Sequence, residues 1–443
     1  MKYLMFPIPA ILSVVLAMGI PEAATPASIT LPAQGAWTSG VYRNLFAEMG
    51  KTTTEIDAKV NAAYTQLFEG DITNQRLFFE TGDMGYIKAI DSDDIRSEGM
   101  SYGMMIAVMM DKQVVFDKLW KFAKTYMQHA SGDRAGYFSW QLSTTAPFAM
   151  KDPNSAPDGE EYFAMSLFFA SKRWGDGVGT LNYSVEANNI LKAMVQKVPN
   201  SSVVQIMNPT HKMVEFSPAA GPERFTDPSY HLPAFYELWS RWASQDKAFW
   251  KAAADTSRVF FKRACHPVTG LATDYQDFNG TPKTTSFNAN SATFNADSWR
   301  VAMNIGMDYA WFRADDWQVT QSVRLLNFFN GKGAYKSAYS QDGATALVTY
   351  QSEGHIAMNA VAALASNDTI AYKFVNALWA KPISTGTYRY YNGLLQMMAL
   401  LHCSGKYVIW GRDTIPSTIE NSIPNQRPSG SSHRWDLTGR LVQ

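Results

Sequence analysis

Six segments of this chain are apolar on nearly every side, and their recurrence constrains the fold more than any other feature. Each follows a polar loop that carries a carboxylate, a serine or a tyrosine, and each is rich in Ala, Met and aromatic residues. A helix that is apolar all round belongs in a protein interior, so the sequence predicts six buried helices. They begin near Glu98, Glu161, Ser229, Ser298, Glu353 and Tyr391.

Amphipathic segments alternate with the buried ones. In one of them, Val115, Leu119 and Phe122 recur at helical spacing, and lysines occupy the other face. Six buried helices that alternate with six amphipathic ones predict an all-α fold, an (α/α)6 barrel in a single domain over residues 26–410. A helical-repeat solenoid is the alternative, but unequal spacings and the lack of a shared consensus disfavour it. The amphipathic segments span 54–68, 112–127, 184–197, 247–264, 316–330 and 367–380.

The N-terminus has the pattern of an export signal. Lys2 precedes an apolar run over residues 4–20, and small residues follow it. This order predicts a secretory signal peptide over residues 1–25 and a secreted or periplasmic protein. A retained anchor helix is the alternative, which Pro7 and Pro9 within the apolar run disfavour.

Charge and cysteine content exclude several classes of function. Lys and Arg (39) balance Asp and Glu (39), so no basic stripe offers a footprint for nucleic acid. The seven histidines and two cysteines lack metal-ligand spacing, which excludes structural zinc. Cys265 and Cys403 are expected to be buried free thiols, and a disulfide between them is the alternative. No later run approaches the roughly 20 apolar residues of a membrane span, and we expect a monomer.

Polar loops separate the predicted helices. The loops 200–226 and 267–296 are rich in Pro, Thr, Asn and Gly and are expected to contain short β segments. The tail 411–443 combines Pro with Ser, Asn and Arg, which predicts loop structure.

Three carboxylates, Glu98, Asp158 and Asp297, lie where buried helices are expected to begin. Each one alone has the pattern of a helix cap. Charge beside an apolar helix is costly unless it serves a purpose, and the loops that carry these residues should converge at one end of the barrel. The pattern therefore indicates a hydrolase or a binding protein with a carboxylate-lined cavity.

Six motifs resemble, in order, those of glycoside hydrolase family 8, and especially its xylan-degrading branch. The resemblance covers about residues 35 to 410, and the (α/α)6 barrel it implies agrees with the fold expected from the helix pattern. The motifs are GVYRNLFAEMG (40–50), SEGMSYGMM (97–105), APDGEEYFA (156–164), DPSYHLPAFYELW (227–239), DSWRVAMN (297–304) and TGTYRYYNGLLQMMALLHCSG (385–405).

The resemblance implies a role for each motif residue. Glu98 matches the general acid, Asp297 the catalytic base, and Asp158 a third carboxylate that holds the sugar at the cleavage point. Tyr230 and Arg300 match residues around the base and its water. An inverting glycosidase needs one protonated and one ionised carboxyl group, so burial and the charge of Asp158 are expected to raise the pKa of Glu98. Because two carboxyl groups and water suffice, the resemblance implies neither a metal nor an organic cofactor.

Aromatic residues in or near these motifs are candidate sugar platforms, although the high aromatic content favours a core position for each of them taken singly. Trp140 and Tyr391 are favoured because their motifs resemble the cleft lining of the family. His231 and His355 are expected to be hydrogen-bonding or core residues rather than acid–base groups. The other candidate platforms are Tyr102, Tyr230, Trp299 and Tyr390.

The mode of attack is less well determined than the bond attacked. Family members that release single xylose units from reducing ends close the cleft with a Leu-His-Pro kink, which segment 350–355 of this chain lacks. We therefore expect internal cleavage of xylan or xylo-oligosaccharides. The alternatives are a reducing-end exo-oligoxylanase, a cellulase or chitosanase of the same family, and a carbohydrate-binding barrel without catalysis.

Overall fold

The computed structural model describes residues 28–412 and two short paired strands, β6 (Arg434–Trp435) and β7 (Leu441–Val442). The signal peptide predicted over 1–25 lies outside the described residues, as does most of the tail 411–443. Among the described residues, no helix is long and apolar enough to cross a membrane. Cys265 and Cys403 are buried free thiols, as expected.

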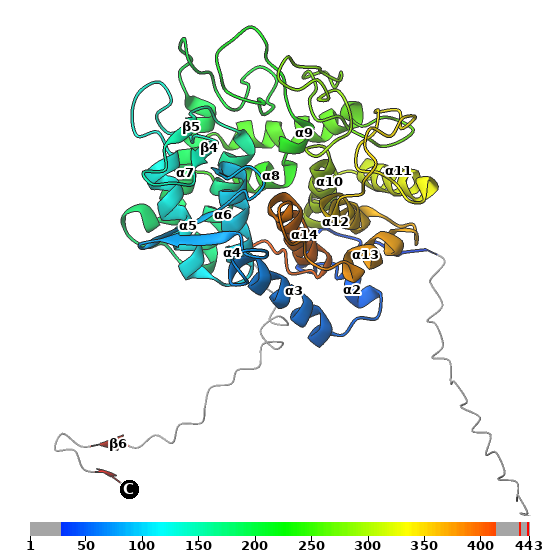
Figure 1. Cartoon of the computed structure of the whole chain (residues 1–443), viewed down its shortest axis with the longest axis horizontal. Coiled ribbons are helices and arrows are strands. Elements are labelled where there is room, and N and C mark those ends of the chain that lie inside the picture. Colours follow the sequence, from blue (N-terminus) through cyan, green and yellow to red (C-terminus); the bar gives the residue numbers. More distant parts are fainter. Residues whose placement is uncertain (1–27, 413–433, 436–440, 443) are drawn as a thin grey trace, which may run out of the picture.

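Six buried helices form the inner ring, and each coincides with a segment predicted from its all-round apolarity (Figure 1). Within the central turns of these helices nearly every residue is buried. Pro157 at the first turn of α6 suits a helix start, where its missing N–H has no partner to lose. The six are α4 (Ser97–Met109), α6 (Pro157–Trp174), α8 (Pro233–Trp242), α10 (Trp299–Phe312), α12 (Glu353–Ala362) and α14 (Arg389–Cys403).

Six amphipathic helices form the outer ring, each packed against an inner neighbour. Thr52 and Glu55 begin the first of them with a capping box, in which each residue bonds to the backbone N–H of the other. The six are α3 (Thr53–Phe68), α5 (Gln113–Phe122), α7 (Tyr183–Gln196), α9 (Lys247–Ala264), α11 (Trp317–Lys332) and α13 (Ala371–Ala380).

The inner ring closes on itself. Along the chain, α4 contacts α6, α8 contacts α10, α10 contacts α12, and α12 contacts α14, which returns to α4. The rings of Tyr162 and Phe235, 5.0 Å apart, join α6 to α8. The (α/α)6 barrel expected from the sequence is confirmed.

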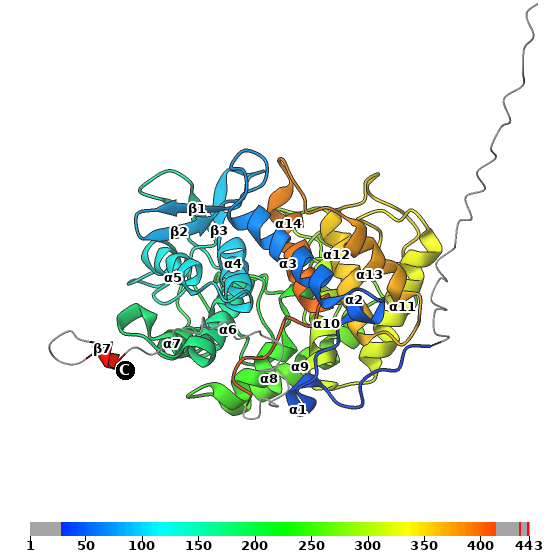
Figure 2. The same cartoon turned by 90° about the horizontal axis from the view of Figure 1, so that it is seen from below.

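The β structure of the two long loops is limited to single bridges. The loops 200–226 and 267–296 contain the expected short β segments only in this form, for example between Val203 and Ala219. The named strands of the barrel region form two antiparallel sheets, of which β2 and β3 contact α4 (Figure 2). The strands are β1 (Phe78–Thr81), β2 (Met84–Ile87), β3 (Asp94–Arg96), β4 (Gln141–Ser143) and β5 (Met150–Asp152).

Shorter helices complete the described chain. They include α1 and α2 before the barrel and single turns that extend α5 and α12 or precede α7 and α8. Their bounds are Ala36–Ser39, Leu45–Glu48, Ala123–Met127, Ala363–Ala365, Gly179–Leu181 and Pro228–Tyr230.

Candidate active site

A single buried guanidinium group, that of Arg300, holds the three predicted carboxylates together. Its Nη1 atom donates to Asp158 Oδ2 at 2.7 Å and to Glu98 Oε2 at 3.3 Å, and its Nη2 atom donates to Asp297 Oδ1 at 3.2 Å. Tyr102 accepts a further hydrogen bond from Nη1 at 2.8 Å. Residues far apart in the chain therefore meet at one point, as the motifs predicted.

These side chains converge because each belongs to the beginning of an inner helix. Glu98, Asp158 and Arg300 lie in the first turns of α4, α6 and α10, and Tyr390 lies in the first turn of α14. In an (α/α)6 barrel these ends share one rim, where polar groups reach solvent without crossing the apolar interior.

The small sheet before α4 fixes the position of Glu98. Strand β3 ends at Arg96, one residue before the helix, and pairs with β4. The Ser97 N–H then donates to the Trp140 carbonyl at 3.0 Å. Trp140 thus lies beside the start of α4, half-buried, with its ring 5.8 Å from the Arg96 guanidinium.

Burial raises the pKa of Glu98 to about 7. Arg300 lowers the pKa, whereas the charges of Asp158 and Asp297 raise it. One cation among three carboxylates does not offset the loss of hydration, so Glu98 retains its proton near neutral pH. The Tyr390 hydroxyl donates to Glu98 Oε1 at 3.0 Å and orients the carboxyl group.

Asp297 differs from the other two carboxylates in its exposure. Its side chain is 33% exposed, against 16% for Glu98 and 4% for Asp158. Burial also raises the pKa of Asp158, opposed by Arg300. The site therefore contains a buried proton-holding carboxyl group and a more accessible carboxylate on different nitrogens of one guanidinium group.

The aromatic candidates fall into two groups. Tyr102 and Tyr390 are only 1% exposed, so the expected platform role does not fit their rings; their hydroxyl groups instead contact Arg300 and Glu98. Tyr391 is half-buried and donates to the Ala296 carbonyl at 2.9 Å. Tyr230 is also buried, at 6% exposure, and its ring lies 5.6 Å from the Arg300 guanidinium.

The histidines are core residues. His231 bonds to Thr226 and Ser257, and burial lowers its pKa to about 3. His355 is buried too, and its pKa is also lowered to about 3. Burial thus keeps both rings neutral near pH 7, in line with the expected hydrogen-bonding or core role.

Asp274, which no sequence motif singled out, holds the turn that carries Asp297. Its Oδ1 atom accepts from the backbone N–H groups of Asn295 at 3.2 Å and Ser298 at 3.0 Å. It thereby caps the start of α10 from an earlier part of the same loop, and burial raises its pKa well above the ordinary value. Only its place in a polar loop, TDYQD (273–277), hinted at a role.

A chamber of about 790 Å³ is lined by Tyr391 and Trp299 but by none of the three carboxylates. It is linked to the Arg300 cluster through Tyr391, whose ring lies 6.0 Å from the Arg300 guanidinium. Segment 350–353, where the Leu-His-Pro kink is absent, forms part of its wall. Residues of segments 382–385 and 388–392 form the rest of the wall, and among them Tyr388 is strongly exposed. The chamber is open to solvent and has room for a substrate chain.

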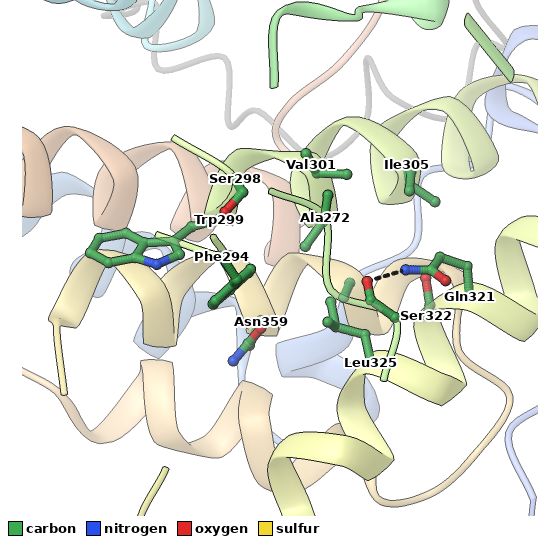
Figure 3. A pocket seen from close by; sticks show the side chains of 13 residues that line it. Ala272, Phe294, Ser298, Trp299, Val301, Ile305, Gln321, Ser322, Leu325 and Asn359 are labelled. Atoms are coloured by element: carbon green, nitrogen blue, oxygen red, sulfur yellow. Dashed lines mark hydrogen bonds between the residues drawn. The ribbon is translucent and has the colours of Figure 1, made fainter. Parts of the chain in front are cut away.

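A second cavity, behind Trp299, is of another kind (Figure 3). It measures about 10 Å³ between α10, α11 and α12, and apolar side chains such as Val301, Ile305 and Leu325 line it. Gln321 spans one side and donates to the Gly270 carbonyl at 2.7 Å. This volume is no larger than a single water requires, so the cavity belongs to the core.

Within residues 28–412, no group of His, Cys, Asp and Glu side chains has the arrangement of a metal site. A paired acid and base beside an open chamber is the arrangement of a glycoside hydrolase. Comparison with known families agrees: residues 85–405 match the model for glycosyl hydrolases family 8. The chain belongs to this family of inverting enzymes.

Known relatives resemble the chain over nearly their whole length. It is 40% identical to a reducing-end xylose-releasing exo-oligoxylanase of Paenibacillus barcinonensis over 86% of this chain and all of that protein. A second such enzyme, of Halalkalibacterium halodurans, is 41% identical over 85% and 96% of the two chains. A solved xylobiose complex of a family 8 protein from Teredinibacter turnerae has a TM-score of 0.83, with 43% identity over 85% and 100%.

Proposed function

We propose that this enzyme hydrolyses β-1,4-xylosidic bonds of xylan or xylo-oligosaccharides, with Glu98 as acid and Asp297 as base. The observation that carries the assignment is the Arg300 cluster, which joins a proton-holding carboxyl group to an accessible carboxylate. The xylose-releasing activity named for both curated relatives supports the choice of sugar.

In this mechanism Glu98 donates its proton to the glycosidic oxygen as the bond to the anomeric carbon breaks. Asp297 removes a proton from a water that attacks the same carbon from the opposite face. Asp158, buried against Arg300, is placed to hold the sugar at the cleavage point. The net reaction consumes one water and needs no other reactant.

Product stereochemistry tests this division of roles. NMR spectra recorded early in the hydrolysis of a β-linked xylo-oligosaccharide should show the α-anomer of the new reducing end, because water attacks once and inverts the carbon. An initial β-anomer would contradict the pairing of Glu98 with Asp297.

Two modes of attack have separate support. The names of the curated relatives favour release of xylose from reducing ends over the internal cleavage expected from the sequence. The chamber favours internal cleavage, because segment 350–353 leaves space where a kink would block the chain. A xylohexaose complex of the Teredinibacter turnerae xylanase, 43% identical, is consistent with a long cleft in a relative.

Time courses on xylohexaose and on polymeric xylan separate the two modes. Reducing-end release predicts xylose and xylopentaose as the first products and little loss of viscosity from the polymer. Internal cleavage predicts a rapid loss of viscosity, with xylobiose and longer fragments before free xylose. An enzyme that degrades neither substrate would contradict the proposed function itself.

We also propose that the protein is exported and acts as a monomer. The basis for export is Lys2 followed by the apolar run 4–20 and small residues. Mass spectrometry of the mature protein should show a new N-terminus near residue 25, and a full-length protein in the membrane fraction would indicate an anchor instead. Size-exclusion chromatography with light scattering measures the oligomeric state.

A further inference from the structure

An aromatic ledge leads away from the cleavage site to the protein surface. We give this name to Phe216, Phe225, Tyr275 and Phe287, which come from two loops outside α8 and α9 (Figure 1). The ring of Phe216 lies 4.9 Å from that of Phe225 and 4.4 Å from that of Tyr275. These rings cover one another and hold the two loops together.

The ledge is continuous with the active site at one end and exposed at the other. The rings of Phe216 and Tyr230 are 6.1 Å apart and nearly parallel, at 6°, and Tyr230 lies beside Arg300. On its other side, Phe216 lies 5.8 Å from Phe287 at 22°. Phe287 is 65% exposed, so much of its ring faces solvent rather than the cluster.

The loop around Phe287 has the composition of a sugar-binding surface. Residues 284–296 contain no charged side chain, although most of them reach solvent. Residues with hydroxyl and amide groups, such as Ser286, Asn288 and Asn290, are the neighbours of Phe287 in the sequence. A pyranose unit offers C–H groups on its faces and hydroxyl groups around its edge, so a flat ring with neutral polar neighbours complements it.

The loop is also held in place before any substrate arrives. Ser291 Oγ donates to the carbonyls of Lys283 and Asn288, each at 2.8 Å, and accepts from the Thr285 N–H at 3.2 Å. The Tyr275 N–H donates to the Ser291 carbonyl at 2.8 Å. A ring presented on an ordered loop loses little conformational entropy on binding.

We infer that Phe287, supported by Phe216, is a distal binding subsite for a neutral xylosyl unit of the substrate chain. This inference rests on the proposed function, because it assigns the ledge to the same chain that Glu98 and Asp297 cleave. The ledge shares no residue with the chamber beside Tyr391, so it lengthens the substrate path in another direction under either mode of attack.

The test compares Phe287→Ala with wild type on xylo-oligosaccharides of increasing length. Loss of one stacking contact should lower kcat/KM on the longest oligosaccharides about three- to tenfold, mainly through KM. The shortest cleaved oligosaccharide does not reach the ledge, so kcat/KM on it should change less than about twofold. Phe287→Tyr should restore the preference for long chains, because it keeps a flat ring.

Val268→Ala is the matched control, because Val268 is an apolar residue that is 75% exposed and far along the chain from Phe287. This variant should leave kcat/KM unchanged on every oligosaccharide. If Phe287→Ala lowers kcat/KM equally on every chain length, or on none, the inference is overturned. If wild type cleaves no xylo-oligosaccharide, the proposed function fails instead, and the two failures are thereby distinguished.

Discussion

The two ends of α10 each join a buried arginine to carboxylates, yet only one end is suited to chemistry. In the first turn, Arg300 faces Glu98, Asp158 and Asp297. Two turns later, Asp308 accepts two hydrogen bonds from Arg258 of α9, at 2.8 and 2.9 Å, and Arg258 also binds Glu237 of α8. We call these the rim network and the lower network.

The ratio of cations to carboxylates separates the networks. Burial alone would raise the pKa of Glu237, but hydrogen bonds and charge from Arg258, assisted by Arg241, lower it below the ordinary value. In the rim network one cation serves three carboxylates, and the pKa of Glu98 rises to about 7. Where cations match the carboxylates in number, as in the lower network, they form a permanent structural clamp, whereas a surplus of carboxylates leaves a proton available for transfer.

Removing single carboxyl groups should produce the largest difference between the networks. Glu98→Gln and Asp297→Asn should each lower kcat about 10³-fold or more, because each removes a distinct proton transfer. Circular dichroism and thermal unfolding should show an intact fold in both variants. Near-normal turnover in either purified variant would contradict its assignment.

Asp308→Asn is the matched control for that comparison. It should keep kcat within about twofold while lowering the free energy of unfolding by about 3 kcal/mol, since it leaves Arg258 partly unpaired in the interior. A large loss of kcat without a loss of stability would show that the lower network also serves catalysis.

Arginine-to-lysine substitutions sharpen the comparison. A lysine ammonium cannot reproduce the two nitrogens by which Arg300 reaches three carboxylates, so Arg300→Lys should lower kcat about 100-fold. Arg258→Lys should instead lower the melting temperature and leave kcat nearly unchanged. Steady-state kinetics and calorimetry on both variants measure the two effects. An equal loss of kcat in the two variants would show that the two networks do not differ in their role in catalysis.

Asp274 tests whether the rim depends on a precisely held turn. Asp274→Ala removes the acceptor for Asn295 and Ser298 and should lower kcat about tenfold with little change in KM, because Asp297 loses its position. Asp274→Asn keeps an acceptor oxygen and should recover most of the activity. If Asn and Ala variants are equally impaired, the charge of Asp274 matters rather than its hydrogen bonds.

The smallest expected effect is the dependence of activity and stability on pH. Glu98 must be protonated to act as acid, so kcat/KM should fall as pH rises through about 7. Its folded-state pKa exceeds the ordinary 4.5, so its contribution to stability is complete below pH 4.5 and is lost as pH rises through about 7. Unfolding midpoints of Glu98→Gln measured across this range should therefore vary less with pH than those of wild type.

Much of the barrel could be predicted because its signals are local. Each inner helix is apolar on all faces within its own dozen residues, and each outer helix shows its buried stripe within a few turns. Glu98, Asp158 and Asp297 were recognisable because each begins such a helix, and Arg300 follows Asp297 by one helical turn. These spacings involve residues only a few positions apart, so they do not depend on how the helices pack together.

Contacts between distant segments depended on how the helices pack. Nothing in the order of residues says that the Tyr390 hydroxyl binds Glu98, that Asp274 caps the start of α10, or that Phe287 lines up with Tyr230. The same applies to the burial of Tyr102, which converts an expected platform into a partner of Arg300. These contacts form, and stabilise the protein, only after the ring of helices has closed and brought the loops to one rim. A helix, by contrast, depends on residues that are only a few positions apart in the sequence.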